Sequence, residues 1–425
     1  MVVVEIAAIG QSLYDSALIS EANGGLHRFW GHYVQVSRPI CMANILIDFE
    51  KTWILESGLG QFGMELGAAL IQQCRDDGRD DEQLQFFLPP SRLEEFARQG
   101  VKTKLVRRWQ KSLYGRSIRQ LINRFIPGPR YDLWHITNQC SRYEPWNRSV
   151  PVVLTIHDLN FLRERKGRQK VIETRLQDLQ QKVDRASCVT TISYFVANEV
   201  QEHLELQGKP LRVIYNGAAS ANAAENSRPH WAPEGNFLFS IGLFGEKKNF
   251  HTLVEMLEHL PEYQLVLAGI CETEYGQKVR DSAATCGVAE RTILPGPISN
   301  AERQWLYANC SAFTFPSLTE GFGLPVIEAM KLGKPVFMST ATSLPEIGGN
   351  WGFYWDTFDP QEMAATLRQG LEQAEATPNF ADQVRQHASQ FTWAQAAREY
   401  LQLYREVIAG TIDQPQSLLS HRHAA

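Results

Sequence analysis

The chain contains 425 residues, of which 44% are hydrophobic and 21% charged, and its formal net charge is −5. This composition is typical of a globular protein with enough apolar surface for two or three domains. No apolar run approaches the roughly 20 residues that a membrane-spanning helix needs, so no membrane span is expected.

The first part of the chain, residues 1–41, shows no clear period and is expected to be an extension of unknown role. Its apolar start lacks a basic region and carries Glu5, so we do not expect a signal peptide. A strand is predicted at 42–48, followed by a glycine-rich turn and a helix. Further strands are predicted at 152–157, 188–193 and 211–216. This alternation predicts an N-terminal Rossmann-like domain over 42–216.

A stretch of small and polar residues with Pro and Gly, 217–236, is expected to be an interdomain linker. A second Rossmann-like domain is predicted over 237–391, with strands at 237–242, 263–269, 291–296, 310–317 and 334–339. A helix at 392–410 is expected to pack back on the first domain, before a tail at 411–425. Two such domains face each other across a cleft at the carboxyl edges of their sheets, where ligands bind.

The cysteines are scattered, odd in number and contain no CxxC pair, which argues against a disulfide framework and a zinc site. They favour a reducing compartment, so a cytoplasmic protein is expected. The acidic stretches 75–81 and 356–359 do not have the spacing of a metal-binding motif. We therefore expect neither a metal nor a cofactor.

The densest signal is the stretch 314–336, TFPSLTEGFGLPVIEAMKLGKPV. It predicts a strand, a glycine-containing loop and a helix that starts with proline. The N–H groups of Gly323 and Leu324 would open this helix and form a natural anion site. Glu320 and Glu328 bracket the site, and we interpret them as acceptors for hydroxyls on either side of a diphosphate. Each Glu alone could also be a surface residue stabilised by the helix dipole.

A second anion site is predicted in 240–260, SIGLFGEKKNFHTLVEMLEHL. A strand ends at Gly242, and Asn249 is a good helix N-cap. Because Lys247 and Lys248 precede that cap, two cations and a helix N-terminus would point the same way, although two such lysines could also be solvated. The Walker pattern is absent, so a P-loop is not expected.

Two further motifs follow strands of the first domain. Gly58 and Gly60 in SGLGQF precede the first helix and could admit phosphate or sugar. His157 in LTIHDLNF could hydrogen-bond a substrate hydroxyl or support charge in the transition state, although a single His at a strand end is often structural.

The segment 92–130 holds eleven Lys or Arg and two Glu in an otherwise acidic protein. Its amphipathic part includes the basic residues Arg107, Arg108 and Lys111. We expect it to lie on the anionic inner face of the cytoplasmic membrane and to collect a lipid-linked acceptor, with an ordinary solvated helix pair as the alternative. No nucleic acid partner is expected, because a recognition motif is absent and the net charge is negative.

Taken together, these motifs resemble those of a known family. The stretch PSLTEGFGLPVIEAM resembles the Glu-x7-Glu signature of retaining glycosyltransferases of the GT-B fold, in glycosyltransferase family 4. Further stretches are similar to family motifs and follow the family's order: SGLGQF, TIHDLNF, TTISYF, VIYNG, IGLFGEKKNF, LPGPIS and SLPEIGG. The resemblance covers about residues 42 to 408 and implies an α/β protein of two Rossmann-like domains.

The resemblance implies roles for the matching residues. Glu328 would hold the nucleotide ribose, and Glu320 would contact hydroxyls of the donor sugar. Lys248, helped by Lys247, would neutralise the diphosphate, and His157 would lie near the donor sugar. The remaining donor-binding positions, which include backbone near the base, are Gly58, Gly60, Gly242, Ile298, Gly323 and Leu324.

One position departs from the family pattern. Many members carry Arg after the glycine of the phosphate loop, whereas this chain has Leu243. A subgroup from bacterial polysaccharide synthesis places a basic residue before the lysine, as Lys247 does here, although Lys cannot make the bidentate phosphate contact of Arg. The similarity to this subgroup slightly favours GDP-mannose over a UDP-sugar.

We therefore expect a retaining hexosyltransferase that extends a lipopolysaccharide, capsule or exopolysaccharide on a saccharide or lipid-linked acceptor. Its leaving diphosphate would be stabilised by helix N-termini and lysines rather than by a metal. One alternative is a sugar-phosphate synthase with a small soluble acceptor. Another is a protein that binds a sugar nucleotide without catalysis.

Overall fold

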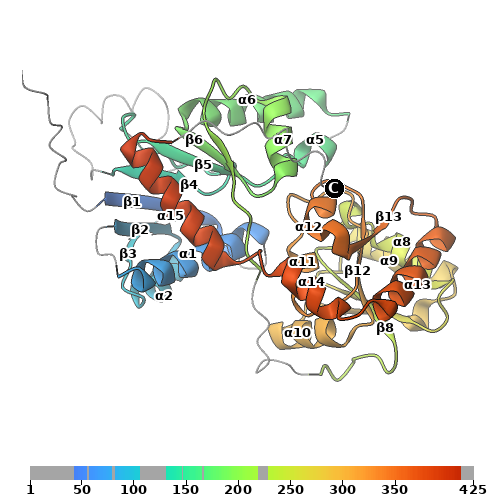
Figure 1. Ribbon diagram of the computed structural model, residues 1–425. Helices are drawn as coiled ribbons and strands as arrows, with labels where there is room; N and C mark the ends of the chain where they lie inside the picture. Colours follow the sequence, from blue (N-terminus) through green and yellow to red (C-terminus); the bar gives the residue numbers. More distant parts are fainter. Residues whose placement is uncertain are drawn as a thin grey trace, which may run out of the picture. The chain divides into compact units, whose positions relative to one another are not determined.

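The structure, a computed structural model, describes residues 43–54, 57–78, 82–105, 131–145, 147–164, 167–218 and 228–412. In these residues, strands and helices alternate and form two separate parallel sheets (Figure 1). The predicted α/β class with two Rossmann-like sheets is confirmed.

The first sheet has the strand order β3-β2-β1-β4-β5-β6-β7, with parallel neighbours throughout. Its strands are β1 (Ala43–Asp48), β2 (Glu82–Leu88), β3 (Lys102–Leu105), β4 (Leu133–Ile136), β5 (Val152–Ile156), β6 (Cys188–Thr191) and β7 (Leu211–Val213). The strand order reverses between β1 and β4, and ligands of open α/β sheets bind at the carboxyl ends of such a switch point.

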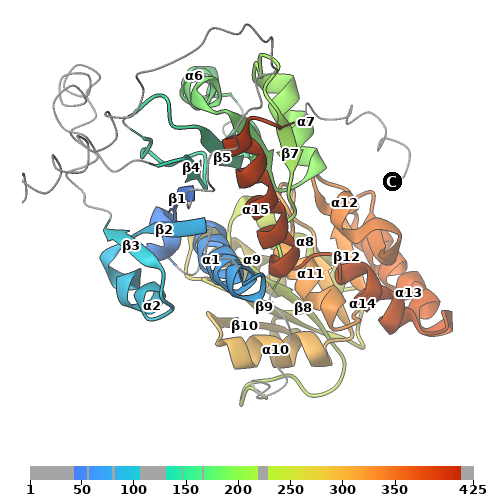
Figure 2. The ribbon, with the colours of Figure 1, turned by 60° about the vertical axis from the view of Figure 1, so that its left-hand side comes forward.

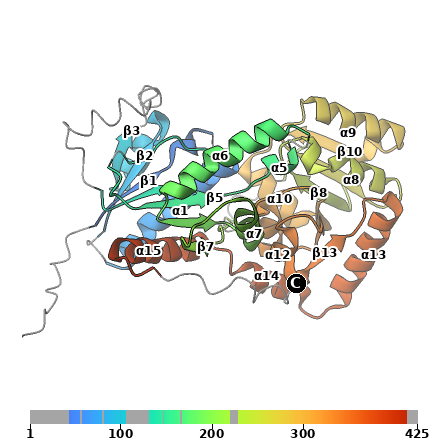
Figure 3. The ribbon, with the colours of Figure 1, turned by 90° about the horizontal axis from the view of Figure 1, so that it is seen from above.

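Helices cover both faces of the first sheet. They are η1 (Glu50–Trp53), α1 (Gly58–Asp76), η2 (Pro90–Arg92), α2 (Leu93–Ala97), α5 (Phe161–Glu164), α6 (Gln169–Arg185) and α7 (Tyr194–His203). Because side chains alternate along a strand, Ile45 and Ile47 pack on the face that α1 covers, and Leu154 and Ile156 pack on the face of α6 and α7. Figure 3 shows α6 lying along these strands.

The second sheet has the order β10-β9-β8-β11-β12-β13 and is also parallel. Its strands are β8 (Phe237–Ile241), β9 (Gln264–Ala268), β10 (Thr292–Gly296), β11 (Ala312–Phe315), β12 (Val336–Ser339) and β13 (Gly352–Trp355). Here the order reverses between β8 and β11, the two strands that precede the predicted anion loops.

The helices of the second sheet form two layers. They are η4 (Glu246–Lys248), α8 (Phe250–Leu257), α9 (Glu274–Thr285), η5 (Ala289–Arg291), α10 (Asn300–Asn309), α11 (Leu324–Lys331), α12 (Leu344–Gly348), η6 (Gly349–Trp351), α13 (Pro360–Ala376) and α14 (Phe380–Ala388). The core of one face contains residues of α8, α9 and α13, and the core of the other contains residues of α10, α11, α12 and α14.

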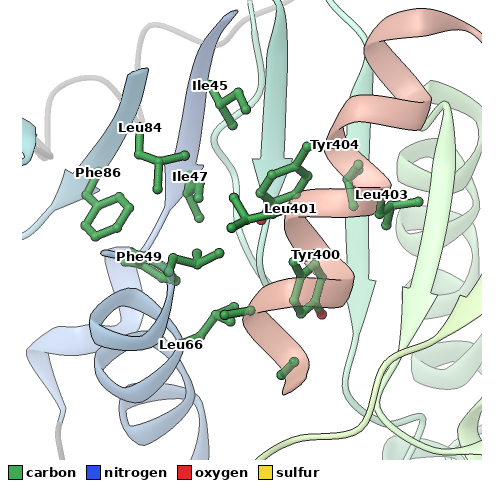
Figure 4. Close-up of a cluster of buried hydrophobic side chains, with 14 of the residues drawn as sticks. Ile45, Ile47, Phe49, Leu66, Leu84, Phe86, Tyr400, Leu401, Leu403 and Tyr404 are labelled. Carbon is green, nitrogen blue, oxygen red and sulfur yellow. The ribbon is translucent and has the colours of Figure 1, made fainter. Parts of the chain in front are cut away.

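The last described helix, α15 (Trp393–Ala409), packs on the first sheet beside α1 (Figure 2). Its Tyr400, Leu401 and Tyr404 share one core with Ile45 and Phe49, as Figure 4 shows. The predicted return of the C-terminal helix to the first domain is therefore confirmed.

A buried polar group also joins α15 to the first sheet. His135 contacts Tyr404 Oη through Nδ1 at 2.7 Å and Thr155 Oγ1 through Nε2 at 2.8 Å. Burial lowers the pKa of His135 to about 3, so the ring is neutral.

The chain crosses from one sheet to the other twice, and the two crossing segments contact each other at Ala218 and Phe391. The N–H of Ala218 donates to the carbonyl of Phe391 at 3.3 Å. A Cβ added at Gly217 would overlap the backbone nitrogen of Trp393, so the close approach requires glycine at this point.

The described start of the basic segment contains a short helix and a strand. Residues 93–97 form the helix α2, and residues 102–105 form β3. Lys102 and Lys104 belong to the edge strand, where lysines oppose pairing with another chain. Residues 106–130 lie outside the described residues.

Candidate active site

Glu320 lies in the loop between β11 and α11 and is held in place by several contacts. Its Oε1 accepts hydrogen bonds from Ser317 Oγ and from Lys248 Nζ, each at 2.6 Å. Its N–H donates to Thr342 Oγ1 at 2.9 Å. Within the described part of the chain, Oε2 accepts no hydrogen bond, so one oxygen of a fixed carboxylate is free to bind a hydroxyl.

Thr342 has an unusual backbone. Its φ is 57°, in the left-handed region that β-branched residues rarely adopt. Such strain persists only where surrounding contacts impose it, and it is common near functional sites. Here the conformation coincides with the hydrogen bond to Glu320.

Lys248 is closely packed on either side of its contact with Glu320. Its side chain is 12% exposed, and Nζ lies 4.6 Å from the ring centroid of Phe315. A Cβ added at Gly242 would come within 2.9 Å of Lys248 Cε. Gly242, predicted to bind the donor, therefore also makes room for the lysine.

The prediction that the Asn249 side chain caps α8 was wrong. Asn249 stands at the N-cap position, but its φ of 56° is left-handed and its side chain makes no capping bond. Instead its carbonyl accepts hydrogen bonds from the N–H and Oγ1 of Thr252, at 3.2 and 2.8 Å. The three-residue turn η4 ends at this residue, and Asn tolerates the conformation that ends it.

Lys247 joins the two anion loops through its backbone. Its carbonyl accepts from the N–H of Leu318 at 2.7 Å and from Ser317 Oγ at 3.1 Å. Its Nζ lies 3.1 Å from Glu164 Oε1, and both side chains are 40% exposed. An exposed pair of this kind is weak, so Lys247 can exchange Glu164 for another anion.

The start of α11 has the features predicted for an anion site. Gly323 occupies the N-cap with a φ of 122°, and Pro325 follows in the first turn. No hydrogen bond joins the N–H of Gly323 or Leu324 to another described residue. These two donors and the helix dipole favour an anion at this end.

Glu328 points to a different set of partners from Glu320. Its Oε2 accepts from Tyr307 Oη at 2.9 Å, and its Oε1 lies 3.6 Å from Arg303 Nη1. Thus the two carboxylates flanking the start of α11 do not share a cation: one pairs with Lys248 and the other with Arg303.

His157 follows β5 and is buried. Its Nε2 donates to the carbonyl of Thr137 at 2.8 Å, and its ring contacts Phe62 edge-on at 4.6 Å between centroids. Burial lowers the pKa of His157 to about 4 although the bond to Thr137 opposes this. The neutral ring carries its hydrogen on Nε2, which leaves Nδ1 as an acceptor.

The loop of Glu320 lies directly against His157. A Cβ added at Gly321 would overlap the carbonyl oxygen of His157, so only glycine allows this approach. Ser193 Oγ donates to the carbonyl of Gly321 at 2.9 Å, and Thr319 Oγ1 donates to Asn160 Oδ1 at 2.6 Å. The carboxyl edges of both sheets therefore meet at this loop.

Glu346 of α12 adds a further contact between the two edges. Its carboxylate accepts the N–H groups of Tyr194 and Phe195 at 2.7 and 2.9 Å, at the start of α7. Burial raises the pKa of Glu346, and the two N–H bonds oppose that rise. The sequence motif SLPEIGG contains this residue, but nothing in the motif identifies its partner.

Asp158 is a site residue that sequence reasoning left without a role. Burial raises its pKa, the charges of Glu164 and Glu320 add to the rise, and Lys247 opposes it. Its Oδ1 accepts the N–H of Asn160 at 3.0 Å. Its position directly after His157, at the end of a strand, was the sequence feature that could have identified it.

The glycines before α1 have different roles. A Cβ added at Gly60 would overlap the carbonyl of Ile54, whereas Gly58 has open space around it. Ser57 caps the helix by accepting the N–H of Gly60 at 3.0 Å. Gly60 is therefore required by local packing, and Gly58 is the one that leaves room for a ligand.

Several predicted residues are not tied to this loop cluster. Ile298 is partly buried and packs against the core of the second sheet. Arg107, Arg108 and Lys111 lie outside the described residues. Among the described residues, no group of His, Cys, Asp or Glu has a metal-binding arrangement, and no helix is long and apolar enough to span a membrane.

A pocket of about 480 Å³ lies at the opposite edge of the second sheet. Its lining includes Tyr263, Ser311 and Pro335, which precede β9, β11 and β12, together with residues of α13. Because ligands of parallel sheets bind at the carboxyl ends of strands, we assign the chemistry to the loops around Glu320 rather than to this pocket.

Two family models match the chain in succession. The model described as Glycosyltransferase Family 4 matches residues 73–220, and the model described as Glycosyl transferases group 1 matches residues 223–387. Together they account for nearly all of the chain between residues 73 and 387.

Curated relatives are similar over part of the chain. A serotype-specific mannosyltransferase, WbdA, of Escherichia coli is 28% identical over 234 residues, which are 50% of this chain and 28% of that protein. O-antigen chain mannosyltransferase B of Escherichia coli is 28% identical over 280 residues, 61% of this chain and 71% of that protein. The chain thus spans less than a third of the length of the first of these relatives.

A solved structure supports the fold. The sucrose-phosphate synthase of Thermosynechococcus elongatus superposes with a TM-score of 0.66 and 18% identity, over 87% of this chain and 100% of that one. The predicted GT-B fold is confirmed by this likeness and by the two parallel sheets. The chain therefore has the GT-B fold, with a region that matches the Glycosyltransferase Family 4 model followed by a region that matches the Glycosyl transferases group 1 model.

Proposed function

We propose that the protein transfers a hexosyl group from a nucleotide diphosphate sugar to a saccharide or lipid-linked acceptor, with retention of configuration. The observation that carries the proposal is the contact of Lys248 with Glu320 at 2.6 Å, in a loop that packs on His157. A cation, a hydroxyl acceptor and a neutral imidazole thereby meet beside a helix N-terminus.

In the proposed complex, the diphosphate lies at the start of α11. The free N–H groups of Gly323 and Leu324 donate to it, and Lys248 supplies positive charge. Negative charge grows on the diphosphate as the bond to the sugar breaks, so donors already in place stabilise the transition state. Lys247 adds a second cation by exchanging its exposed pairing with Glu164.

The transferred sugar lies between Glu320 and His157 in this proposal. Oε2 of Glu320 accepts a sugar hydroxyl while Oε1 stays bound to Lys248 and Ser317. Nδ1 of His157 accepts a second hydroxyl, because Nε2 is bound to a carbonyl. The acceptor oxygen approaches the face from which the diphosphate leaves, which gives retention.

The mannosyltransferase relatives and the lysine pair favour GDP-mannose over UDP-sugars as the donor. The name of the second relative supports a cell-surface polysaccharide such as an O-antigen as the product. Such work on a lipid-linked acceptor would take place at the cytoplasmic face of the membrane.

The membrane contact proposed for 92–130 has its own test. Charge reversal at Arg107, Arg108 and Lys111 should weaken binding to vesicles containing anionic phospholipid, because each basic residue near such a surface contributes about 1 kcal/mol. Binding that does not change would contradict this contact and would favour a small soluble acceptor.

Donor binding can be tested by the change in melting temperature with GDP, UDP, GDP-mannose and UDP-glucose. We expect one nucleotide series to raise the melting temperature, and Lys248→Met to abolish the rise. Lys278→Met is the matched control, because Lys278 is an exposed lysine of α9 that pairs with Glu246. A rise that survives in Lys248→Met, or no rise with any nucleotide, would contradict the proposal.

A further inference from the structure

Two side chains of α10 converge on the carboxylate of Glu328. Arg303 and Tyr307 are four residues apart, so they lie on the same face of the helix. Tyr307 Oη donates to Oε2 of Glu328 at 2.9 Å, and Arg303 Nη1 lies 3.6 Å from Oε1. Each oxygen of the carboxylate thus has its own partner.

Tyr307 is held rigidly and keeps its hydrogen. The residue is fully buried, and its ring lies 5.0 Å from that of Phe239 and 5.2 Å from that of Phe313 between centroids. Burial raises the pKa of Tyr307 well above its ordinary value, and the charge of Glu328 acts in the same direction. The phenol is therefore a permanent donor with one orientation.

Arg303 faces more than one carboxylate. Its side chain is 19% exposed, and its buried Nε has no hydrogen-bond partner among the described residues. On α1, burial raises the pKa of Glu65; Arg303 opposes that rise, and the charge of Glu328 adds to it. Arg303, like Lys331, is therefore a cation near two carboxylates that come from helices of different sheets.

A carboxylate offers about four acceptor positions, and the hydrogen bond from Tyr307 together with the ion pair to Arg303 leaves at least two of them open. We infer that Tyr307 and Arg303 are positioning residues that hold Glu328 with its remaining acceptor positions towards a nucleotide ribose. This inference rests on the proposed function, and it names the residues that make the nucleotide site selective for ribose. A site that hydrogen-bonds a hydroxyl rejects an analogue without it, because its own polar group is left unpaired.

The probe is a nucleoside diphosphate with and without its ribose 2′-hydroxyl: GDP against 2′-deoxy-GDP, or the UDP pair if UDP is the base series that binds. Affinity is measured by calorimetry on the full chain. In the wild type we expect the ribonucleotide to bind roughly tenfold more tightly. Tyr307→Phe keeps the ring and removes the donor, so the preference should fall by about three- to tenfold.

The matched control is Tyr275→Phe. Tyr275 is also buried in the second half of the chain, and its hydroxyl contacts His251 Nδ1 at 2.9 Å, away from Glu328. We expect this variant to keep the wild-type preference. Arg303→Leu should also reduce the preference, and Arg303→Lys should restore part of it, which a change in folding alone would not do.

The outcomes separate the inference from the proposed function. If Glu328→Gln removes the preference but Tyr307→Phe and Arg303→Leu keep it, the positioning role is wrong and the ribose assignment stands. If Glu328→Gln also keeps the preference, or if the wild type has none, the ribose assignment itself fails. Failure of both nucleotide series to bind would contradict the proposed function as a whole.

Discussion

The carboxyl edges of the two sheets differ in how they use charge. At the second edge, ionised groups are paired: Lys248 with Glu320, and Arg303 with Glu328. At the first edge, burial moves titratable groups towards their neutral forms, lowering the pKa of His157 to about 4 and raising that of Asp48 to about 7. Under the proposed function, the second edge would bind the charged diphosphate and the first would bind uncharged hydroxyls.

Asp48 shows why the first edge is neutral. It ends β1 at the switch point and is fully buried. Its Oδ1 accepts the N–H of Glu50 at 3.0 Å, and its Oδ2 accepts from Ser141 Oγ. Burial is the largest cause of the raised pKa of Asp48, and the charge of Glu50 adds to it. The charge of Lys51 opposes the rise only weakly, and the carboxyl group joins two loops through its hydrogen bonds.

The largest effect is expected at the second edge. Glu320→Gln removes the charge that pairs with Lys248 and should lower kcat/KM by roughly 10²- to 10³-fold, as the loss of one charged group from a preorganised site does. Glu272→Gln is the control, because Glu272 is 82% exposed and pairs with Arg280 on the surface. Initial rates with the sugar nucleotide that raises the melting temperature test the difference. Equal rates for both variants would show that the charge of Glu320 is not needed for catalysis.

The contact between the edges gives the next largest effect. Gly321→Ala should force the loop away from the His157 carbonyl and lower kcat by about 10- to 100-fold, because small displacements of a reacting group are costly. Gly245→Ala has open space for its Cβ and should behave like the wild type. If both variants keep full activity and the same melting temperature, the close contact of the Gly321 loop with His157 is not needed for activity.

The first edge can be tested through its pH dependence. The pKa of Asp48 is higher in the folded chain than when unfolded, so its stabilising effect is full below about pH 4 and is lost as pH rises through about 7. Asp48→Asn should remove this loss, worth at most about 4 kcal/mol, and flatten the stability profile between about pH 4 and 7. Urea unfolding at several pH values measures it, and an unchanged slope would contradict a neutral Asp48.

The smallest effect is expected for the exposed pair of Lys247 with Glu164. Glu164→Gln should change the free energy of unfolding by less than about 1 kcal/mol, because exposed ion pairs contribute little. If the pair competes with the donor, the same variant should bind the nucleoside diphosphate slightly more tightly and with a different salt dependence. A large loss of stability would show that this pair is structural.

The sequence predicted best the features that are local. The strand, loop and helix around Glu320 follow from adjacent residues, and so does the lysine turn before α8. The apolar face of α15 predicted a buried helix. Such features depend on spacing along the chain, which can be read without knowledge of the tertiary structure.

Long-range partners could not be predicted in the same way. Nothing near Glu346 indicates that it accepts N–H groups of α7, and nothing near Asn160 identifies Thr319. The strand β3 was missed because an edge strand rich in lysine lacks the apolar alternation of a buried one. The left-handed turn at Asn249 was missed because a good capping residue also tolerates that conformation.

The most direct test is the release of nucleoside diphosphate from GDP-mannose and from UDP-sugars by the full chain. The account predicts release from one sugar nucleotide, lost in Lys248→Met and kept in Lys278→Met. The central claim is that Lys248 and the loop of Glu320 promote cleavage of the bond between the sugar and the diphosphate. Binding of the sugar nucleotide without any release would contradict it, and so would release that Lys248→Met leaves unchanged.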